Sequence, residues 1–423
     1  MKEDFLHYLW KHKKFDLLNL KSADGSVIHI VKVGTHNHNA GPDFFNAQIE
    51  INELLWVGNV EIHMSSSDWC LHGHQDDPNY ENVILHVVWE HDLDIHLRDN
   101  SKIPVLVLKD YVRPTLLKSY NQLFKKAEKW INCESDFKSV QPFILNHWLE
   151  RLFIERLEAK SNRILQLLKV TNNNWEAVMF QLLARGFGLK VNGDAFASMA
   201  KSFDFKVLRK SQSKLPILEA LLFGQAGLLN TPCDHKYFKT LHSDYQFLRK
   251  KFGLTNESVV SIQFFRLRPM NFPTIRMAQL ANLYHENRYV FAELMTLNII
   301  EDYYKFFTMS ASSFWNTHYT FDKASKSVKK VLSKPFIDLI ILNVIIPMKF
   351  CYRRYFGNMD YEDLIVLADS IKPEKNNVIS AFNSLRKVAT SAYQSQALLE
   401  LKSEYCDRNR CLNCAVGHSL LSR

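Results

Sequence analysis

The sequence has few cysteines, no long hydrophobic run and no recognisable export signal. Its seven cysteines are an odd number and too few to staple 423 residues, so we expect a reducing, cytoplasmic setting. The most apolar stretch, residues 336–346, contains Asp338 and Asn343 and is shorter than the roughly 20 residues that cross a bilayer. The first four residues include two acids where a secretory signal carries bases. With 47% hydrophobic and 23% charged residues, the chain is not disordered, and its length favours two or three domains.

Charge and histidine are unevenly distributed along the chain. Residues 1–115 hold 10 basic and 17 acidic side chains and 11 of the 17 histidines, while the remainder holds 43 basic and 27 acidic side chains. An acidic, histidine-rich part joined to a basic part suggests a metal site beside a surface for a polyanion. A lysine-rich solubilising surface next to an unrelated acidic lobe would give the same totals.

Hydrophobic spacing predicts an α/β part followed by a mainly helical part. The first part is expected to contain a helix at 4–18, strands at 27–33, 45–51, 55–64 and 83–89 with an irregularity at Gly58-Asn59, a turn-rich segment at 66–80, and a hairpin closed by 103–108. Helical spacing recurs at 149–157, 164–168, 178–183, 218–222, 277–283 and 385–399, without a repeat of fixed period. We therefore expect an α/β domain at 1–115, a mainly helical basic region at 116–400 and a cysteine-containing segment at 401–423.

Two acids and a histidine in the predicted strands are candidates for catalysis. Glu61 and His63 are two residues apart, so on a strand they point the same way, and Asp43 opens the preceding strand after a Gly-Pro turn. Two carboxylates and a nitrogen base at one edge of a sheet can hold Mg²⁺ and place a water on a phosphodiester. The plainer alternative is that Asp43 caps a turn and that Glu61 and His63 face solvent.

These residues, within roughly residues 1–110, resemble the signature of the PD-(D/E)XK nuclease superfamily. The signature places Pro-Asp at the second strand and an acid, any residue and lysine on the third, which here are Pro42, Asp43, Glu61, Ile62 and His63. The resemblance implies a restriction-endonuclease-like core of helix, three strands, helix and strand, with Asp43 and Glu61 binding Mg²⁺ or Mn²⁺. The third residue would orient or deprotonate the attacking water. Histidine in place of lysine could do this, could ligate the metal, or could mark an inactive descendant.

Longer phrases are similar to an uncharacterised family of bacterial proteins common in Bacteroidota, a domain of unknown function. The phrases lie at residues 39–44, 58–63, 67–69, 85–88 and 268–273. This resemblance spans most of the chain and implies no activity.

Other histidines offer a zinc site instead. His-X-His pairs occur at 36–38 and 72–74, and the second pair is followed by Asp76 and Asp77. A zinc hydrolase built from these residues is an alternative within catalysis, although no His-Glu-X-X-His sequence is present. His86 lies in a strand expected to be buried, where a hydrogen-bonded core role is more usual.

A third group of metal-ligand residues lies near the C-terminus. It has the spacing Cys-X4-Cys-X2-Cys followed by a histidine, at Cys406, Cys411, Cys414 and His418. Three thiolates and an imidazole would complete a zinc site. Alternatively, the three cysteines and a distant one, such as Cys133 or Cys70, would hold an iron–sulfur cluster. Reduced, buried thiols are the third option.

A stiff, basic loop in the helical region is a candidate for phosphate binding. Two prolines lie in a segment with Arg266, Arg268 and Arg276, whose guanidinium groups suit phosphate oxygens, although they could instead pair with acids inside the protein. The sequence as a whole predicts a metal-dependent nuclease acting on DNA or RNA. The alternatives are a non-catalytic nucleic-acid or protein-binding module on a degenerate nuclease scaffold, and the zinc hydrolase.

Overall fold

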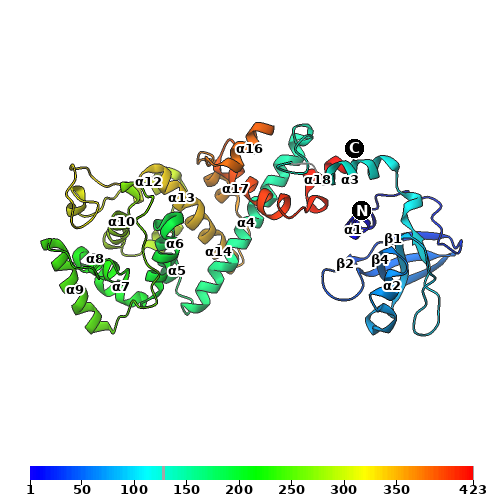
Figure 1. Cartoon of the computed structure of the whole chain (residues 1–423), viewed down its shortest axis with the longest axis horizontal. Helices are drawn as coiled ribbons and strands as arrows, with labels where there is room; N and C mark the ends of the chain where they lie inside the picture. Colours follow the sequence, from blue (N-terminus) through cyan, green and yellow to red (C-terminus); the bar gives the residue numbers. More distant parts are fainter. Residues whose placement is uncertain (126–128, 423) are drawn as a thin grey trace. The chain divides into compact units, whose positions relative to one another are not determined.

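The chain folds into two compact units (Figure 1). The computed structural model describes residues 1–125 and 129–422. The N-terminal unit comprises Met1–Trp148 and Leu401–Arg423, and the helical unit comprises Leu149–Glu400. The sequence-based boundary at residue 115 thus lies inside the N-terminal unit, and the C-terminal segment belongs to that unit.

A mixed six-stranded sheet forms the centre of the N-terminal unit. Its strands are β1 (Ile28–Lys32), β2 (Thr35–His36), β3 (Phe44–Ile51), β4 (Leu54–Ser65), β5 (Val83–Glu90) and β6 (Val105–Val107). They lie in the order β1-β3-β4-β5-β6, with β2 paired to β3. The pairs among β1, β3 and β4 are antiparallel, whereas β5 runs parallel to both β4 and β6. The predicted strand-rich N-terminal part followed by a mainly helical region is confirmed.

The middle strands carry the burial that their sequences predict. Residues 83–88 of β5, which lies between β4 and β6, are all buried, in agreement with the almost unbroken apolar run of this strand. The expected irregularity in β4 is confirmed by a register shift against β5 between Asn59 and Val60. A side chain at Gly58 would overlap Ile84 and the backbone of Asn82, so glycine permits the close approach at this bend.

Two predicted elements of this unit differ from the structure. Helix α1 (Glu3–Lys11) is shorter than the predicted helix at 4–18, because Lys13 adopts a left-handed backbone with φ of 48°. The amide of Lys14 then donates to the carbonyl of Leu9, which closes the helix. The predicted hairpin that residues 103–108 close is confirmed only next to its turn, where His96 bridges Lys102 in the antiparallel sense and the amide of Ile103 donates to the carbonyl of Ile95. Beyond it, β6 pairs in parallel with β5 instead of continuing the hairpin.

Short helices complete the N-terminal unit. They are α2 (Asp68–Leu71), α3 (Pro114–Phe124) and α18 (Ala415–Leu421), with short helical turns at Leu401–Cys406 and Cys411–Asn413. Helix α1 contacts β4, and α18 contacts α3. The end of the chain therefore packs on α3, and its cysteine turn at Cys411–Asn413 contacts α1.

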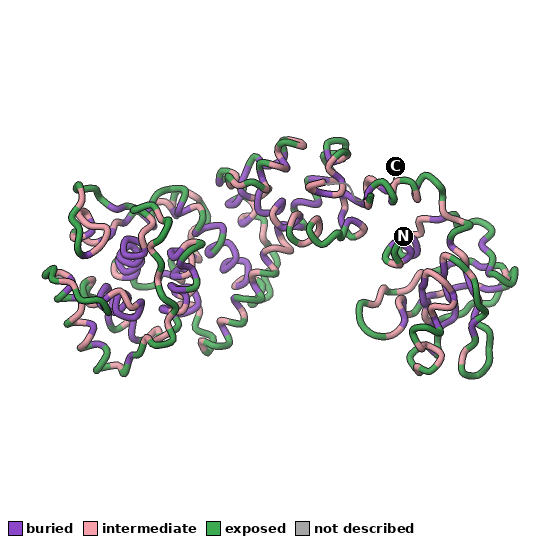
Figure 2. The backbone as a smooth tube through the Cα atoms, in the orientation of Figure 1, coloured by how far each residue is buried: buried purple, intermediate pink, exposed green. Residues whose placement is uncertain are grey.

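The helical unit contains an almost fully buried helix, α10 (Pro273–Glu286). Its helices are α4 (Pro142–Val170), which begins in the N-terminal unit, α5 (Trp175–Phe187), α6 (Leu189–Lys201), α7 (Phe205–Ser211), α8 (Leu215–Gln225), α9 (Lys236–Phe252), α10 (Pro273–Glu286), α11 (Val290–Thr296), α12 (Ile300–Phe306), α13 (Lys334–Ile340), α14 (Ile346–Tyr355), α15 (Glu362–Asp369), α16 (Asn377–Leu385) and α17 (Ala392–Glu400). Every residue of α10 from Pro273 to Tyr284 is buried (Figure 2). The predicted helix at 385–399 is wrong in part, because α16 ends at Leu385 and α17 begins only at Ala392.

One helical stretch of this unit is long and apolar enough to cross a membrane. It runs through α13, a π-helical turn and α14, from Lys334 to Tyr355, and 72% of its most apolar window is buried inside the protein. Such burial is typical of a core helix.

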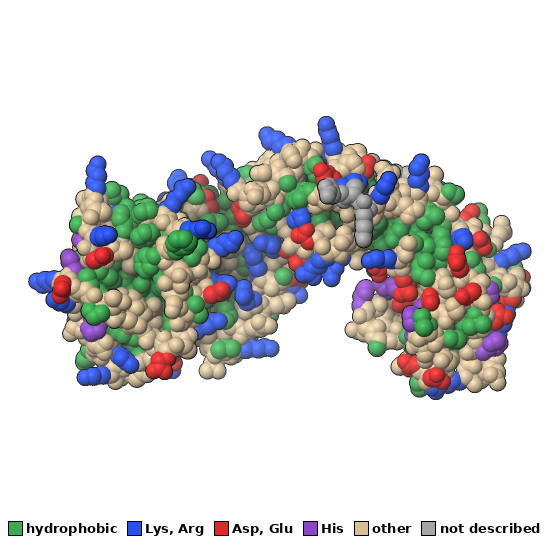
Figure 3. Space-filling view, viewed as in Figure 1, with side chains coloured by type: hydrophobic (Ala, Val, Ile, Leu, Met, Phe, Trp, Pro, Cys, Tyr) green, Lys and Arg blue, Asp and Glu red, His purple; other side chains and the backbone are tan. Residues whose placement is uncertain are grey.

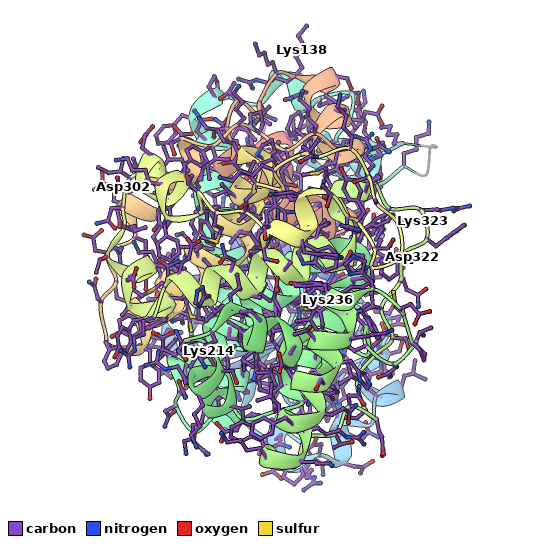
Figure 4. The ribbon with its side chains drawn as sticks, turned by 90° about the vertical axis from the view of Figure 1, so that its left-hand side faces the viewer. Lys138, Lys214, Lys236, Asp302, Asp322 and Lys323 are labelled. Carbon is purple, nitrogen blue, oxygen red and sulfur yellow. The ribbon has the colours of Figure 1, made fainter. Side chains whose placement is uncertain are left out.

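Between α12 and α13, Asp322 and Lys323 lie on an exposed loop (Figure 4).

Candidate metal-dependent active site

The structure brings the two predicted carboxylates together at the start of β3. The backbone amide of Asp43 donates to Glu61 Oε2 at 3.1 Å, and the amide of Ile62 donates to Asp43 Oδ2 at 3.0 Å. Each acid thus accepts a hydrogen bond from the strand that carries the other. This reciprocal arrangement fixes both side chains where the start of β3 pairs with β4 near Val60.

Three histidines join Glu61 at the same point. His63 Nε2 lies 3.4 Å and His74 Nε2 lies 3.3 Å from Glu61 Oε1, and His72 Nδ1 lies 3.1 Å from His63 Nε2. The ligand atoms of His63, His72 and His74 all lie within 4.8 Å of one another, which is a spacing that one metal ion can bridge. The structure therefore unites residues that the sequence presents as two rival sites.

The local chain path explains how a turn reaches the strand residues. His72 ends α2, and His74 begins a short 3-10 turn, with Gly73 between them in the left-handed region at φ of 73°. Glycine adopts this backbone without steric cost, so both imidazoles can approach β4 from one turn. His63 is buried, His74 is partly buried and His72 is exposed, so the group is accessible from one side.

A second layer of side chains orients the histidines. His63 Nδ1 lies 2.9 Å from His86 Nε2, and the ring of Tyr80 stacks on His74 with centroids 3.8 Å apart. For His63 Nε2 to offer its lone pair to an ion, its Nδ1–H must donate to His86. The predicted core position of His86 is thus correct, and the residue also supports the site.

Burial controls the charge of this group. Burial raises the pKa of Glu61, and the neighbouring Asp43 raises it further. Burial, with smaller effects from the neighbouring histidines, lowers the pKa of His63 to about 2 and that of His86 to about 3. Both imidazoles are therefore neutral at physiological pH, the state in which histidine ligates metals.

Helix α1 connects this site to a large groove. His7 Nε2 lies 3.2 Å from Asp43 Oδ2, and His7 also lines a groove of about 1060 Å³. The basic residues that line this groove are Lys2, Lys11, Lys125, Arg408 and Arg410. Figure 3 shows histidine side chains on the visible face of the N-terminal unit. The acid pair thus lies beside a basic groove.

The remaining predicted residues are not members of the histidine triad. His36 and His38 line the groove, and their ring centroids are 4.3 Å apart. In the helical unit, Arg266 and Arg268 are exposed. Arg276 is only 5% exposed, because it lies over the ring of Phe336 and donates to Gln279 and Asn271. Its guanidinium is thus part of the core of that unit.

The C-terminal cysteines meet a fourth cysteine rather than a histidine. Cys406, Cys411 and Cys414 line one small cavity together with Cys133. The ring of His418 instead packs against His12 and Tyr8. Burial raises the pKa of all four thiols, that of Cys414 to about 11.

Comparison with known proteins gives a family but no activity. No curated protein and no solved structure matches the chain. A family model described as "Protein of unknown function (DUF2851)" matches residues 3–377. Since this match covers nearly the whole sequence, the chain belongs to the DUF2851 family.

Proposed function

We propose that the N-terminal unit is a metal-dependent hydrolase that cleaves phosphodiester bonds in nucleic acid. The observation that carries the proposal is the convergence of Asp43, Glu61 and the three histidines beside a basic groove. The order of helix, strands, short helix and strand in this unit also supports a relationship to the PD-(D/E)XK nucleases.

The ligand atoms favour a transition metal over Mg²⁺. The residues that would hold it are the three histidines, His63, His72 and His74, with Glu61 Oε1 beside two of their nitrogens as a further oxygen ligand. Imidazole suits Zn²⁺ and similar ions, whereas Mg²⁺ prefers oxygen ligands alone. We therefore expect Zn²⁺ or Mn²⁺ at this site, with Mg²⁺ as the weaker activator.

Each side chain has a separate task in the proposed reaction. A bound ion would supply a water of lowered pKa and stabilise charge on a phosphoryl oxygen. Asp43 has 21% of its side chain exposed, against 6% for Glu61, so Asp43 is the carboxylate positioned to accept a proton from an entering water. His7, beside Asp43 Oδ2, would hold that carboxylate in place or relay its proton toward the groove.

An assay of cleavage tests the catalytic proposal. Wild-type protein should cleave single- or double-stranded DNA or RNA with Zn²⁺ or Mn²⁺ and lose this activity with a chelator. Asp43→Ala, Glu61→Ala and His63→Ala should each reduce the rate by more than about 100-fold, because each removes a metal ligand or the proposed base. His96→Ala, an exposed histidine of the same unit, is the matched control.

Two results would contradict this proposal. Cleavage that persists unchanged in all three variants would place the chemistry elsewhere. Binding that is insensitive to metal, with no turnover of any substrate, would identify a non-catalytic module instead.

The groove gives a prediction that does not depend on turnover. Replacing Arg408 and Arg410 together by alanine should weaken binding of nucleic acid and lower the slope of log K against log salt by about 2, about 1 for each lost phosphate contact. Fluorescence anisotropy at several salt concentrations measures the slope. Lys102→Ala with Lys109→Ala removes the same charge from exposed ion pairs outside the groove, and should leave the slope unchanged. Equal slopes for both double variants would exclude the groove as the binding surface.

A further inference from the structure

Four cysteines from two distant parts of the sequence meet in the N-terminal unit. Cys133 follows α3, whereas the other three lie near the end of the chain, and the intervening residues include the whole helical unit. They line a cavity of about 20 Å³, whose other walls are largely apolar, at Ile131, Phe137, Leu401 and Val416. This space is too small for an organic ligand, whereas the four sulfurs around it can bond an inorganic centre directly.

Hydrogen-bond donors point at these sulfurs. Asn132 Nδ2 donates to Cys411 Sγ at 3.4 Å, and the backbone amides of Val416 and Gly417 donate to Cys414. A side chain at Gly417 would overlap the carbonyl of Cys411, so this glycine lets α18 pack directly on the cysteine turn. Amide donors around thiolate sulfur are the outer-shell contacts that stabilise metal-bound thiolates.

The distances between the cysteine sulfurs distinguish a site for a single zinc ion from a site for an iron–sulfur cluster. Tetrahedral zinc, with Zn–S bonds of about 2.3 Å, needs sulfurs about 3.8 Å apart. Within residues 1–125 and 129–422, the group whose ligand atoms all lie within 4.8 Å is the histidine triad, so no three cysteine sulfurs are that close. The sequence Cys-X4-Cys-X2-Cys with a distant fourth cysteine is a spacing known for iron–sulfur clusters.

We propose that Cys133, Cys406, Cys411 and Cys414 ligate an iron–sulfur cluster. The cluster joins the segment at 131–137 to the end of the chain and so links the two parts of the sequence that make up the N-terminal unit. It also anchors both ends of the turn that carries Arg408 and Arg410 into the groove. The proposal does not depend on nuclease activity, because it concerns a different set of ligands.

Analysis of the full-length protein purified without air tests the assignment. We expect iron and acid-labile sulfide in equal amounts, with the visible absorption of an iron–sulfur cluster. Cys133→Ser should lose most of both elements, whereas Cys70→Ser and Cys351→Ser, which change cysteines outside the cavity, should retain them. His418→Ala should also retain them, because its ring lies on His12 and Tyr8.

Measurements on the wild-type protein alone can contradict the proposal. The test therefore remains decisive even if a cysteine variant fails to fold. Zinc without iron, or iron without sulfide, in the wild-type protein purified without air would each exclude the cluster. Retention of iron and sulfide in Cys133→Ser, or their loss in His418→Ala but not in Cys133→Ser, would exclude Cys133 as the fourth ligand.

Discussion

Replacing Glu61 by glutamine is expected to stabilise the metal-free protein while it abolishes metal binding at the histidine triad. Glu61 is 4% exposed, and burial together with Asp43 raises its pKa above the ordinary value of 4.5. A raised pKa in the folded state means that stability present below pH 4.5 is lost as the pH rises toward the folded pKa. At pH 8, Glu61→Gln should therefore raise the unfolding free energy by on the order of 3 kcal/mol. The side-chain carbonyl of the glutamine can still accept the hydrogen bond from the backbone amide of Asp43.

Two measurements on Glu61→Gln test the expected gain in stability and the expected loss of metal binding. Urea denaturation of chelator-treated protein at pH 5 and pH 8 gives the stability change, which should be small at pH 5. Calorimetric titration with Zn²⁺ should show at least about a 100-fold loss of affinity. Glu50→Gln, on the adjacent strand β3, is the matched control and should change neither quantity. A Glu61→Gln protein that binds Zn²⁺ as tightly as wild type would remove Glu61 from the ligand set.

A second acid, in the helical unit, is expected to make that unit less stable at neutral pH than at pH 4.5. Glu219 on α8 is 1% exposed, and burial raises its pKa to about 7. Its carboxylate accepts hydrogen bonds from Tyr237 and, at 2.9 Å, from Ser312, which only partly offset the burial. Because the folded pKa is raised, the stability that Glu219 contributes is complete below pH 4.5 and is lost as the pH rises through about 7. The loss is about 3 kcal/mol.

Glu219→Gln isolates this effect. Glutamine keeps an acceptor for Tyr237 and Ser312 but cannot ionise, so the variant should exceed wild type in unfolding free energy by about 3 kcal/mol at pH 8 and differ little at pH 4.5. Urea unfolding followed by tryptophan fluorescence measures this, and hydrogen exchange of the peptide that contains α8 assigns the transition to the helical unit. Glu257→Gln, an exposed acid of the same unit, should show no such pH dependence. A constant difference across pH would mean that Glu219 stays protonated or stays charged throughout.

Local sequence patterns predict much of the secondary structure because the forces involved are local. The apolar run at residues 83–89 and the alternation at 45–51 arise from the faces that β5 and β3 bury. The failures have tertiary or backbone causes. Helix α1 ends at a left-handed Lys13, and β6 pairs in parallel with β5 rather than in a hairpin, which periodicity does not encode.

Some residues of the candidate site can be predicted from the sequence, and others can be assigned only from the tertiary structure. Glu61 and His63 are identifiable from their spacing on β4, because alternation along a strand fixes which side chains share a face, and Asp43 is identifiable from its position directly before β3. The union of His63 with His72 and His74 depends on how the turn at Gly73 folds back on β4. The convergence of Cys133 with the C-terminal cysteines depends on the return of the chain after the whole helical unit.

The sequence by itself determined the residue types available for metal chemistry, the strand positions of the acid pair and the change from strands to helices. Only the tertiary structure decided which histidines lie beside Glu61 and which cysteine completes the C-terminal group. It also decided that Arg276 is buried. The physical reason is that ligand sets and burial depend on contacts between residues far apart in the chain, whereas propensity and periodicity report only on near neighbours.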